Sequence, residues 1–161
     1  MADLRVKKVK DFSAELSVPG DKSISHRALM FSALSNGPCE VTGFLASEDC
    51  IATRSALEAM GVEVEVLGEN GTHIRVHGCR GEFTKPDRVL DCGNSGTTMR
   101  LLSGLLSGCP FETKLTGDDS LRRRPMNRVA QPLEKMGARI RGRGDRCNAP
   151  LTITGRAQLT P

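Results

Sequence analysis

The chain has 161 residues, of which 38% are apolar, and this is enough to bury one hydrophobic core. A formal net charge of +4 and five Phe without any Trp or Tyr provide few base-stacking side chains, which argues against nucleic acid and favours small anions as partners. The sequence contains no long apolar run and no secretory signal, so we expect a cytoplasmic protein with no membrane partner. Six Cys without a CxxC pair are typical of reduced thiols rather than of a zinc site.

The first half of the chain predicts the order strand, helix, strand, helix, strand, strand. Apolar residues alternate over 14–18, as in a strand, and Pro19-Gly20 then turns the chain. A strand over 39–44, a helix after the N-cap residue Ser47, and a hairpin of strands 62–66 and 73–78 around a turn at 68–71 follow. Ile24, Ala28, Phe31 and Leu34 recur in a helical pattern in the first helix, and Ala52, Ala56, Ala59 and Met60 lie on one face of the second.

The second half repeats this order. Strands are expected at 88–93, 111–117, 138–142 and 151–155. A helix is expected over 94–108, with Leu101, Leu102, Leu105 and Leu106 on one face. A second helix is expected over 124–138, where Pro132 predicts a kink or a local irregularity. The stretches EAMG at 58–61 and EKMG at 134–137 support two copies of one βαβαββ unit.

Polar and basic residues gather where the first helix begins, in the stretch DKSISHR at 21–27, which we name the first anion segment. Lys22 and Arg27 bring positive charge, and Ser23 brings a hydroxyl group beside the backbone N–H groups that a helix N-terminus leaves unpaired. The segment is therefore expected to bind a phosphate or a carboxylate. The alternative is that Asp21 or Ser23 only caps the helix, while Lys22 is solvated.

Two further stretches are suited to anions. The second anion segment, NSGTTMR at 94–100, offers close backbone approach at Gly96 and short hydrogen-bonding groups at Asn94 and Thr97. Its alternative is a turn in which Gly and Asn serve geometry alone. The third anion segment, DDSLRRR at 118–124, offers guanidinium groups, although three consecutive Arg side chains cannot all face one ligand. Some of them are expected to face solvent or to pair with Asp118 and Asp119.

The His residues indicate no catalytic or metal site by their pattern. His26 has an ordinary pKa near neutrality and could act as an acid or base, but beside Arg27 on a helix a packing or hydrogen-bonding role is expected. His73 and His77 are expected on the surface of the hairpin, where the sequence shows no partner for them. HExxH, Walker A and GxGxxG motifs do not occur, so neither a metal nor a nucleotide cofactor is indicated.

Three long stretches resemble the 5-enolpyruvylshikimate-3-phosphate (EPSP) synthase family, in the order in which that family has them. They are VPGDKSISHRALMFSALSNG, LDCGNSGTTMRLLSGLLSG and LTGDDSLRRRPMNRV, and the resemblance covers almost the whole chain. The DKS and NSGTT stretches are more similar to the second bacterial class than to the plant-like first class. UDP-N-acetylglucosamine enolpyruvyl transferases are less similar, because they usually have Asn in place of Ser23 and a reactive Cys in the loop that reads GDDSLRRRP here.

The resemblance implies an α+β fold, the inside-out α/β barrel of βαβαββ repeats that enolpyruvyl transferases share. Two of the three units of one lobe are expected in this chain, at about 19–80 and 86–155. Residues 19–161 would form a partial N-terminal lobe, and the opening segment 1–18 would belong to the other lobe of the complete enzyme.

The resemblance also implies a reaction, the transfer of the enolpyruvyl group of phosphoenolpyruvate to the 5-hydroxyl of shikimate 3-phosphate, with release of phosphate and without a cofactor or metal. By motif position Lys22, Ser23 and Arg27 would hold shikimate 3-phosphate, and Lys22 would be the catalytic residue near both substrates. The residues around phosphoenolpyruvate, in a site sensitive to glyphosate, would be Lys22, Asn94, Gly96, Thr97 and Arg124.

This chain departs from the family in length, because chains of that family are more than twice as long. A Ser-Ala-Gln loop, the Asp assigned as the base, and later Lys and Arg residues of that family would all follow residue 161. We therefore expect a fragment that is inactive alone and that takes the C-terminal part, or a second copy, as its partner. The alternative is a non-catalytic βαβαββ module that binds anions, or RNA phosphates through the Arg residues of 122–146.

Overall fold

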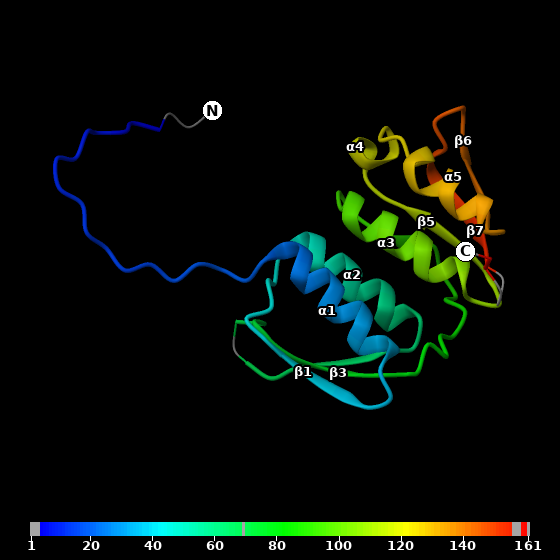
Figure 1. The fold of residues 1–161 in the computed structure, drawn as a ribbon, viewed down its shortest axis with the longest axis horizontal. Coiled ribbons are helices and arrows are strands. Elements are labelled where there is room, and N and C mark those ends of the chain that lie inside the picture. The colour runs from blue at the N-terminus through cyan, green and yellow to red at the C-terminus, as the bar shows by residue number, and fades with distance from the viewer. Residues whose placement is uncertain (1–3, 69, 156–158, 161) are drawn as a thin grey trace.

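Two sheets, each covered on one face by helices, make up the computed structural model, which describes residues 4–68, 70–155 and 159–160 (Figure 1). The first sheet has the order β1-β3-β2 with antiparallel pairs only. The elements of this first unit are α1 (Lys22–Leu34), β1 (Pro38–Thr42), α2 (Glu48–Ala59), β2 (Glu63–Val66) and β3 (His73–His77). Ser47 caps α2 as predicted, and the expected turn contains a hydrogen bond from the Gly71 N–H to the Gly68 carbonyl, while Glu69 lies outside the described residues.

The second unit has a four-stranded sheet of order β4-β5-β7-β6, in which β4 is parallel to β5 and the other pairs are antiparallel. Its elements are β4 (Leu90–Asp91), α3 (Gly96–Ser107), β5 (Glu112–Thr116), α4 (Asp119–Arg122), α5 (Asn127–Lys135), β6 (Arg139–Arg143) and β7 (Asn148–Thr154). The predicted order is confirmed, with the short α4 added. The helix expected from residue 124 begins at Asn127 instead, and it continues for three residues beyond Pro132.

The strand predicted over 14–18 is not formed. Residues 4–20 carry no regular structure and extend away from both units, with Leu16 and Val18 exposed (Figure 1). In the second unit the strand before the first helix, β4, pairs with β5, but the equivalent edge of β1 has no partner among the described residues. An alternating sequence pairs only where a neighbouring strand accepts its backbone hydrogen bonds, and for residues 14–18 the described part of the chain offers none.

The helix expected after Gly20 is formed as α1, but the apolar pattern that indicated it does not mark its buried face. Ile24, Phe31 and Leu34 are 61%, 68% and 42% exposed, and only Ala28 of that pattern is half-buried. The face that packs on the protein consists of Ser25, His26, Leu29, Met30, Ser32 and Ala33. Polar members of this face are tolerated because hydrogen bonds satisfy them: the Ser25 hydroxyl donates to the Asp21 carbonyl and accepts from the Leu45 N–H.

The helices α1, α2 and α3 pack side by side and join the two units (Figure 1). Fully buried side chains from each of them meet in one core, and these include Leu29, Leu57, Met99 and Leu102. Leu102 and Leu106 of α3 are buried as predicted, Leu105 is half-buried and Leu101 is exposed, because the expected stripe is wider than the buried face. Among the helices of the described residues, none is long and apolar enough to cross a membrane.

Candidate anion-binding site

The N-termini of α1, α2 and α3 meet at one end of the three packed helices. Asp21 caps α1, since its carboxylate accepts from the Ile24 N–H at 2.7 Å, and this part of the alternative for the first anion segment is therefore correct. Ser95 caps α3 by accepting from the Thr98 N–H at 3.1 Å. Thr98 in turn donates to the Asp49 carbonyl in the first turn of α2, at 3.1 Å, which ties two of the N-termini together.

Lys22 is held at this end of the molecule by an ion pair. Its Nζ donates to Asp49 Oδ2 at 2.9 Å, across from α1 to α2. The hydrogen bond to Asp49 raises the pKa of Lys22 above its ordinary value, and the nearby positive charge of Arg124 opposes this rise. Lys22 is therefore a protonated, half-exposed ammonium group that lies close enough to Arg124 for their charges to interact.

The second and third anion segments are joined by side-chain hydrogen bonds. Arg124 Nη2 donates to Asn94 Oδ1 at 2.6 Å, and Asn94 Nδ2 donates to Asp118 Oδ2 at 2.7 Å. The hydrogen bond from Asn94, followed by that from the Leu121 N–H, lowers the pKa of Asp118. Asp118 thus pairs with Asn94 rather than with an Arg side chain, and it caps α4. Arg124 is the guanidinium that this arrangement turns toward the N-terminus of α3.

Gly96, the first residue of α3, has no side chain, and the guanidinium groups of two Arg residues lie where another residue would place its Cβ atom. A Cβ atom placed there would lie 2.8 Å from Arg100 Nη1 and 3.2 Å from Arg124 Nη1. Two guanidinium groups therefore face the backbone of the N-terminus of α3 at close range. Thr97 follows as a half-buried residue. Positive side chains and unpaired backbone N–H groups together form an arrangement that attracts phosphate and carboxylate groups.

The structure brings Lys22, Asn94, Gly96 and Arg124 together, whereas no hydrogen bond or ion pair among the described residues links Ser23 or Arg27 to them. Both are exposed on α1, and neither side chain has a hydrogen-bond or ion-pair partner among the described residues. Arg122 pairs with Asp119, as expected for part of the Arg run, and Arg123 is exposed.

Sequence reasoning missed Asp49, and it included Arg100 in the second anion segment without assigning it a role. Asp49 is the partner of Lys22, and it is 27 residues away along the chain. Arg100 is one turn into α3, where its guanidinium lies beside Gly96. Acidic residues are common in the first turn of a helix, so the sequence could place Asp49 at the start of α2. Nothing in the sequence indicates that α2 lies beside Lys22.

His26 is buried where α1, α2 and α3 pack together, and it has the hydrogen-bonding role expected for it. It is 0% exposed, and its Nδ1 lies 2.7 Å from Thr53 Oγ1. Burial lowers its pKa, and the positive charge of Lys22 lowers it further, while Asp49 acts in the opposite direction. His26 is therefore neutral near pH 7.

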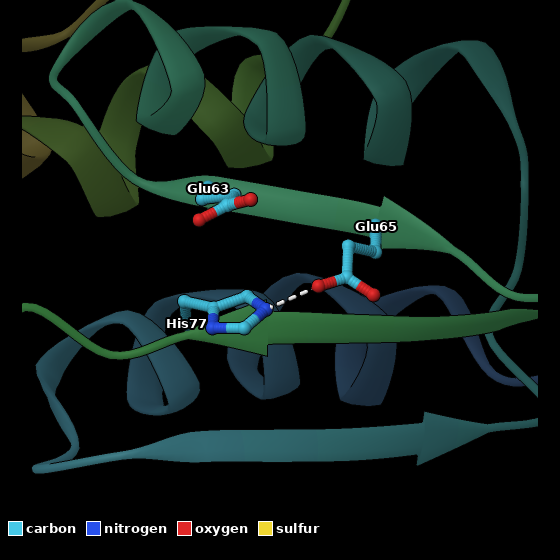
Figure 2. A group of neighbouring side chains, drawn as sticks. All are labelled: Glu63, Glu65 and His77. Atoms are coloured by element: carbon cyan, nitrogen blue, oxygen red, sulfur yellow. Dashed lines mark hydrogen bonds and ion pairs between the residues drawn. The ribbon is translucent and has the colours of Figure 1, made fainter.

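A second group of titratable residues lies on the hairpin of β2 and β3. Glu63, Glu65 and His77 each place one potential metal ligand within 4.8 Å of the others (Figure 2). His77 Nε2 lies 2.6 Å from Glu65 Oε1, and Arg75 donates to the other oxygen of Glu65 at 3.2 Å. Cross-strand ion pairing accounts for this cluster, since Arg75 already brings a positive charge to the carboxylate that a metal would need.

The same face of the sheet brings His73 Nε2 within 3.4 Å of Glu40 Oε2 without a hydrogen bond, so of the two hairpin His residues, for which the sequence showed no partner, His77 gains a hydrogen-bond partner. Both lie at the surface as predicted, with side chains about one-third exposed. The register of β3 against its two neighbours is the reason, because it places Arg75 opposite both Glu40 and Glu65 and brings the flanking His side chains within reach of the same carboxylates.

Comparison with known proteins identifies the family. The family model described as EPSP synthase (3-phosphoshikimate 1-carboxyvinyltransferase) matches residues 6–160. The chain is 53% identical over 155 residues to a 3-phosphoshikimate 1-carboxyvinyltransferase of Geobacter sp. (strain M21), covering 96% of this chain and 36% of the relative. A Synechococcus sp. (strain WH7803) protein of the same name is 57% identical over 141 residues, covering 86% of this chain and 32% of the relative.

A solved structure supports the fold. The EPSP synthase of Acinetobacter baumannii superposes with a TM-score of 0.84 at 48% identity, covering 89% of this chain and 32% of that one. The predicted α+β fold is thereby confirmed, and the alternative of an RNA-phosphate-binding module is not favoured. The chain spans about a third of the length of the curated relatives that it matches. It belongs to the EPSP synthase family.

Proposed function

We propose that this chain provides the phosphate-binding part of an enzyme that transfers the enolpyruvyl group of phosphoenolpyruvate to the 5-hydroxyl of shikimate 3-phosphate. The observation that carries the proposal is the convergence of Lys22, Arg124 and the backbone at Gly96, which the guanidinium groups of Arg100 and Arg124 approach closely, on the N-termini of α1 and α3. Both substrates are multiply anionic, and helix N-termini with positive side chains stabilise such charge.

We assign the roles by place in the fold. Lys22, Ser23 and Arg27 lie on α1 and bind shikimate 3-phosphate. The residues Lys22, Asn94, Gly96, Thr97 and Arg124 surround phosphoenolpyruvate. Lys22 contributes to both sites as a protonated donor, and substrate anions compete with Asp49 for its ammonium group. Fixed positive charge that is oriented before the reaction lowers the barrier without further reorganisation.

Ligand titration of the purified chain tests these roles. Amide signals of residues 22–27 and 94–97 are followed by NMR while shikimate 3-phosphate or phosphoenolpyruvate is added. We expect Lys22→Ala and Arg124→Ala to weaken binding by about tenfold or more, because each removes a charged hydrogen bond worth roughly 1.5–3 kcal/mol. Arg122→Ala is the matched control, since Arg122 is paired with Asp119 and exposed.

Equal binding by Lys22→Ala, Arg124→Ala and the Arg122→Ala control would contradict the assignment. A gel shift with RNA separates the proposal from the RNA-binding alternative. Retention of RNA that falls steeply with salt and is not competed by shikimate 3-phosphate would support the alternative, whereas competition without a gel shift supports the enzyme assignment.

We propose in addition that the exposed apolar side chains of α1 pack against the part of the family's chain that this sequence does not contain. Ile24, Phe31 and Leu34 recur at helical spacing on one face and are exposed. Contiguous exposed apolar surface of this kind is typical of an interface. The chain alone is therefore expected to be inactive and to self-associate or to bind a complementary polypeptide.

An assay of phosphate release tests this expectation. The chain is incubated with both substrates alone, and then with the C-terminal two-thirds of a relative as a second polypeptide. We expect release only in the mixture, and we expect Phe31→Glu to abolish it, while Lys85→Glu, at an exposed site outside that face and outside the anion segments, does not. Sustained release by the chain alone would contradict the proposal.

A further inference from the structure

Buried hydroxyl groups connect the three helix N-termini behind the anion-binding residues. His26 Nδ1 lies 2.7 Å from Thr53 Oγ1, and Thr53 Oγ1 lies 2.8 Å from Thr98 Oγ1. Thr98 Oγ1 is in turn 2.7 Å from Ser95 Oγ and 3.1 Å from the Asp49 carbonyl oxygen. His26, Thr53, Thr98 and Ser95 are each buried, so water does not compete for these bonds. We name these four residues the hydroxyl chain.

The proton positions in the hydroxyl chain follow from the contact of Thr98 with the carbonyl oxygen of Asp49. A carbonyl oxygen can only accept, so the 3.1 Å contact between Thr98 Oγ1 and the Asp49 carbonyl is a hydrogen bond when Thr98 donates its single hydroxyl proton there, and that proton is then not available to Thr53. In this arrangement Thr53 donates to Thr98. The one proton of Thr53 is then used, so Thr53 accepts from a proton on Nδ1 of His26.

The surroundings of the other ring nitrogen of His26 also favour a proton on Nδ1. Nε2 is buried and has no hydrogen-bond partner among the described residues. A second N–H at Nε2, in the imidazolium or in the other neutral tautomer, would be a buried donor without an acceptor, and such an orphaned donor is costly. The lowered pKa of His26, which is caused mainly by burial, also keeps the ring neutral.

We propose that His26 is a positioning residue whose Nδ1–H form orients the hydroxyl chain, and that this chain sets the spacing between the Lys22–Asp49 pair and the Asn94–Gly96 backbone. The inference rests on the proposed function of those groups as one anion-binding site. At one end, the chain fixes the carbonyl of Asp49, whose carboxylate holds Lys22. At the other end, it fixes Ser95, which caps α3 between Asn94 and Gly96.

The tautomer of His26 is the first test, and it needs no ligand. Nitrogen-15 NMR of the purified chain at pH 7 distinguishes a protonated from an unprotonated ring nitrogen. We expect the proton on Nδ1 and a bare Nε2. A proton on Nε2, or a doubly protonated ring, would overturn the proposal, because either would reverse or break the direction of the hydroxyl chain.

A matched set of Thr variants is the second test. Thr53→Val keeps the shape but removes the hydroxyl group, and Thr53→Ser keeps the hydroxyl group. Thr113→Val is the control, because Thr113 is a buried Thr on β5 whose hydroxyl has no partner among the described residues. We expect Thr53→Val to lose the Nδ1–H signature and to shift the amide signals of Lys22 and Gly96, and we expect Thr53→Ser to restore both.

The affinity for inorganic phosphate, read from the same amide signals, is expected to fall about tenfold in Thr53→Val, because displaced catalytic groups lose oriented contacts. Amide signals at Lys22 and Gly96 that move no more in Thr53→Val than in Thr113→Val would overturn the positioning role. Failure of the unsubstituted chain to bind phosphate would count against the proposed function alone, since the tautomer and the ligand-free amide shifts still decide the role of His26.

Discussion

The replacement Gly96→Ala tests how closely the second anion segment is packed. The added methyl carbon would lie 2.8 Å from Arg100 Nη1 and 3.2 Å from Arg124 Nη1, and both distances are shorter than ordinary contact. The atoms that it meets are the ends of flexible side chains, so the backbone of α3 need not move. Arg124 has to retreat instead, and this lengthens its 2.6 Å hydrogen bond to Asn94.

The magnitude follows from these contacts. Loss of a hydrogen bond by a charged group costs roughly 1.5–3 kcal/mol, so we expect binding of phosphoenolpyruvate to weaken by about tenfold or more. Stability should change little, because Ala restricts the unfolded chain and offsets the displacement of the guanidinium groups by roughly 0.4–1 kcal/mol. Gly96→Ala is therefore expected to separate ligand affinity from the free energy of unfolding.

Isothermal titration with phosphoenolpyruvate and urea denaturation measure the two quantities. Gly104→Ala, on the same helix, is the control, because a Cβ atom there would meet nothing within 4 Å. It is expected to leave affinity unchanged and to raise stability slightly. In a full-length enzyme, Gly96→Ala should weaken the longer anion glyphosate more than phosphoenolpyruvate. Unchanged affinity for both anions in Gly96→Ala would refute the contact argument.

Three further predictions concern stability. Because burial lowers the pKa of His26 below its ordinary value of 6.5, the unfolded chain takes up a proton that the folded chain does not, so stability should fall as the pH drops below about 6.5. His26→Gln should remove this part of the pH dependence in urea titrations between pH 7 and pH 5, and an unaltered slope would contradict it. Asp21→Ala, which removes the cap of α1, should lower the free energy of unfolding by about 1 kcal/mol, and an equal loss in Ser23→Ala would contradict the cap assignment. Leu102→Ala should cost about 2–5 kcal/mol in thermal unfolding, against less than about 1 kcal/mol for Leu101→Ala, because only Leu102 is fully enclosed.

Local signals in the sequence were sufficient for much of the fold and for the helix N-termini at which the candidate site lies. The caps and turns that punctuate the chain, such as Ser47 and Gly71, act within a few residues, so their roles can be predicted without tertiary structure. The order of the second unit follows for the same reason. The residues at the entrances of α1 and α3 could be placed at helix N-termini from the sequence, because a helix N-terminus requires only local sequence to form.

The buried face of α1 was decided by tertiary structure. Two stripes of α1 have helical spacing, one with Ile24 and Phe31 and one with Leu29 and Ala33, and the periodicity cannot choose between them. The second is buried because α2 packs there and offers Thr53 as a partner for His26. The strand expected over 14–18 is not formed for a similar reason, because a strand requires a neighbouring strand and not only an alternation of apolar and polar residues.

The electrostatics of the site also required the folded chain. The charges of Lys22, Arg100 and Arg124 are evident from the sequence, but only the family resemblance, and no pattern in the residues themselves, placed Lys22 and Arg124 at a common region. The pairing of Lys22 with Asp49 joins residues 27 positions apart. Coulomb interactions and hydrogen bonds depend on distances through space, and these distances exist only once α1, α2 and α3 have packed into one core.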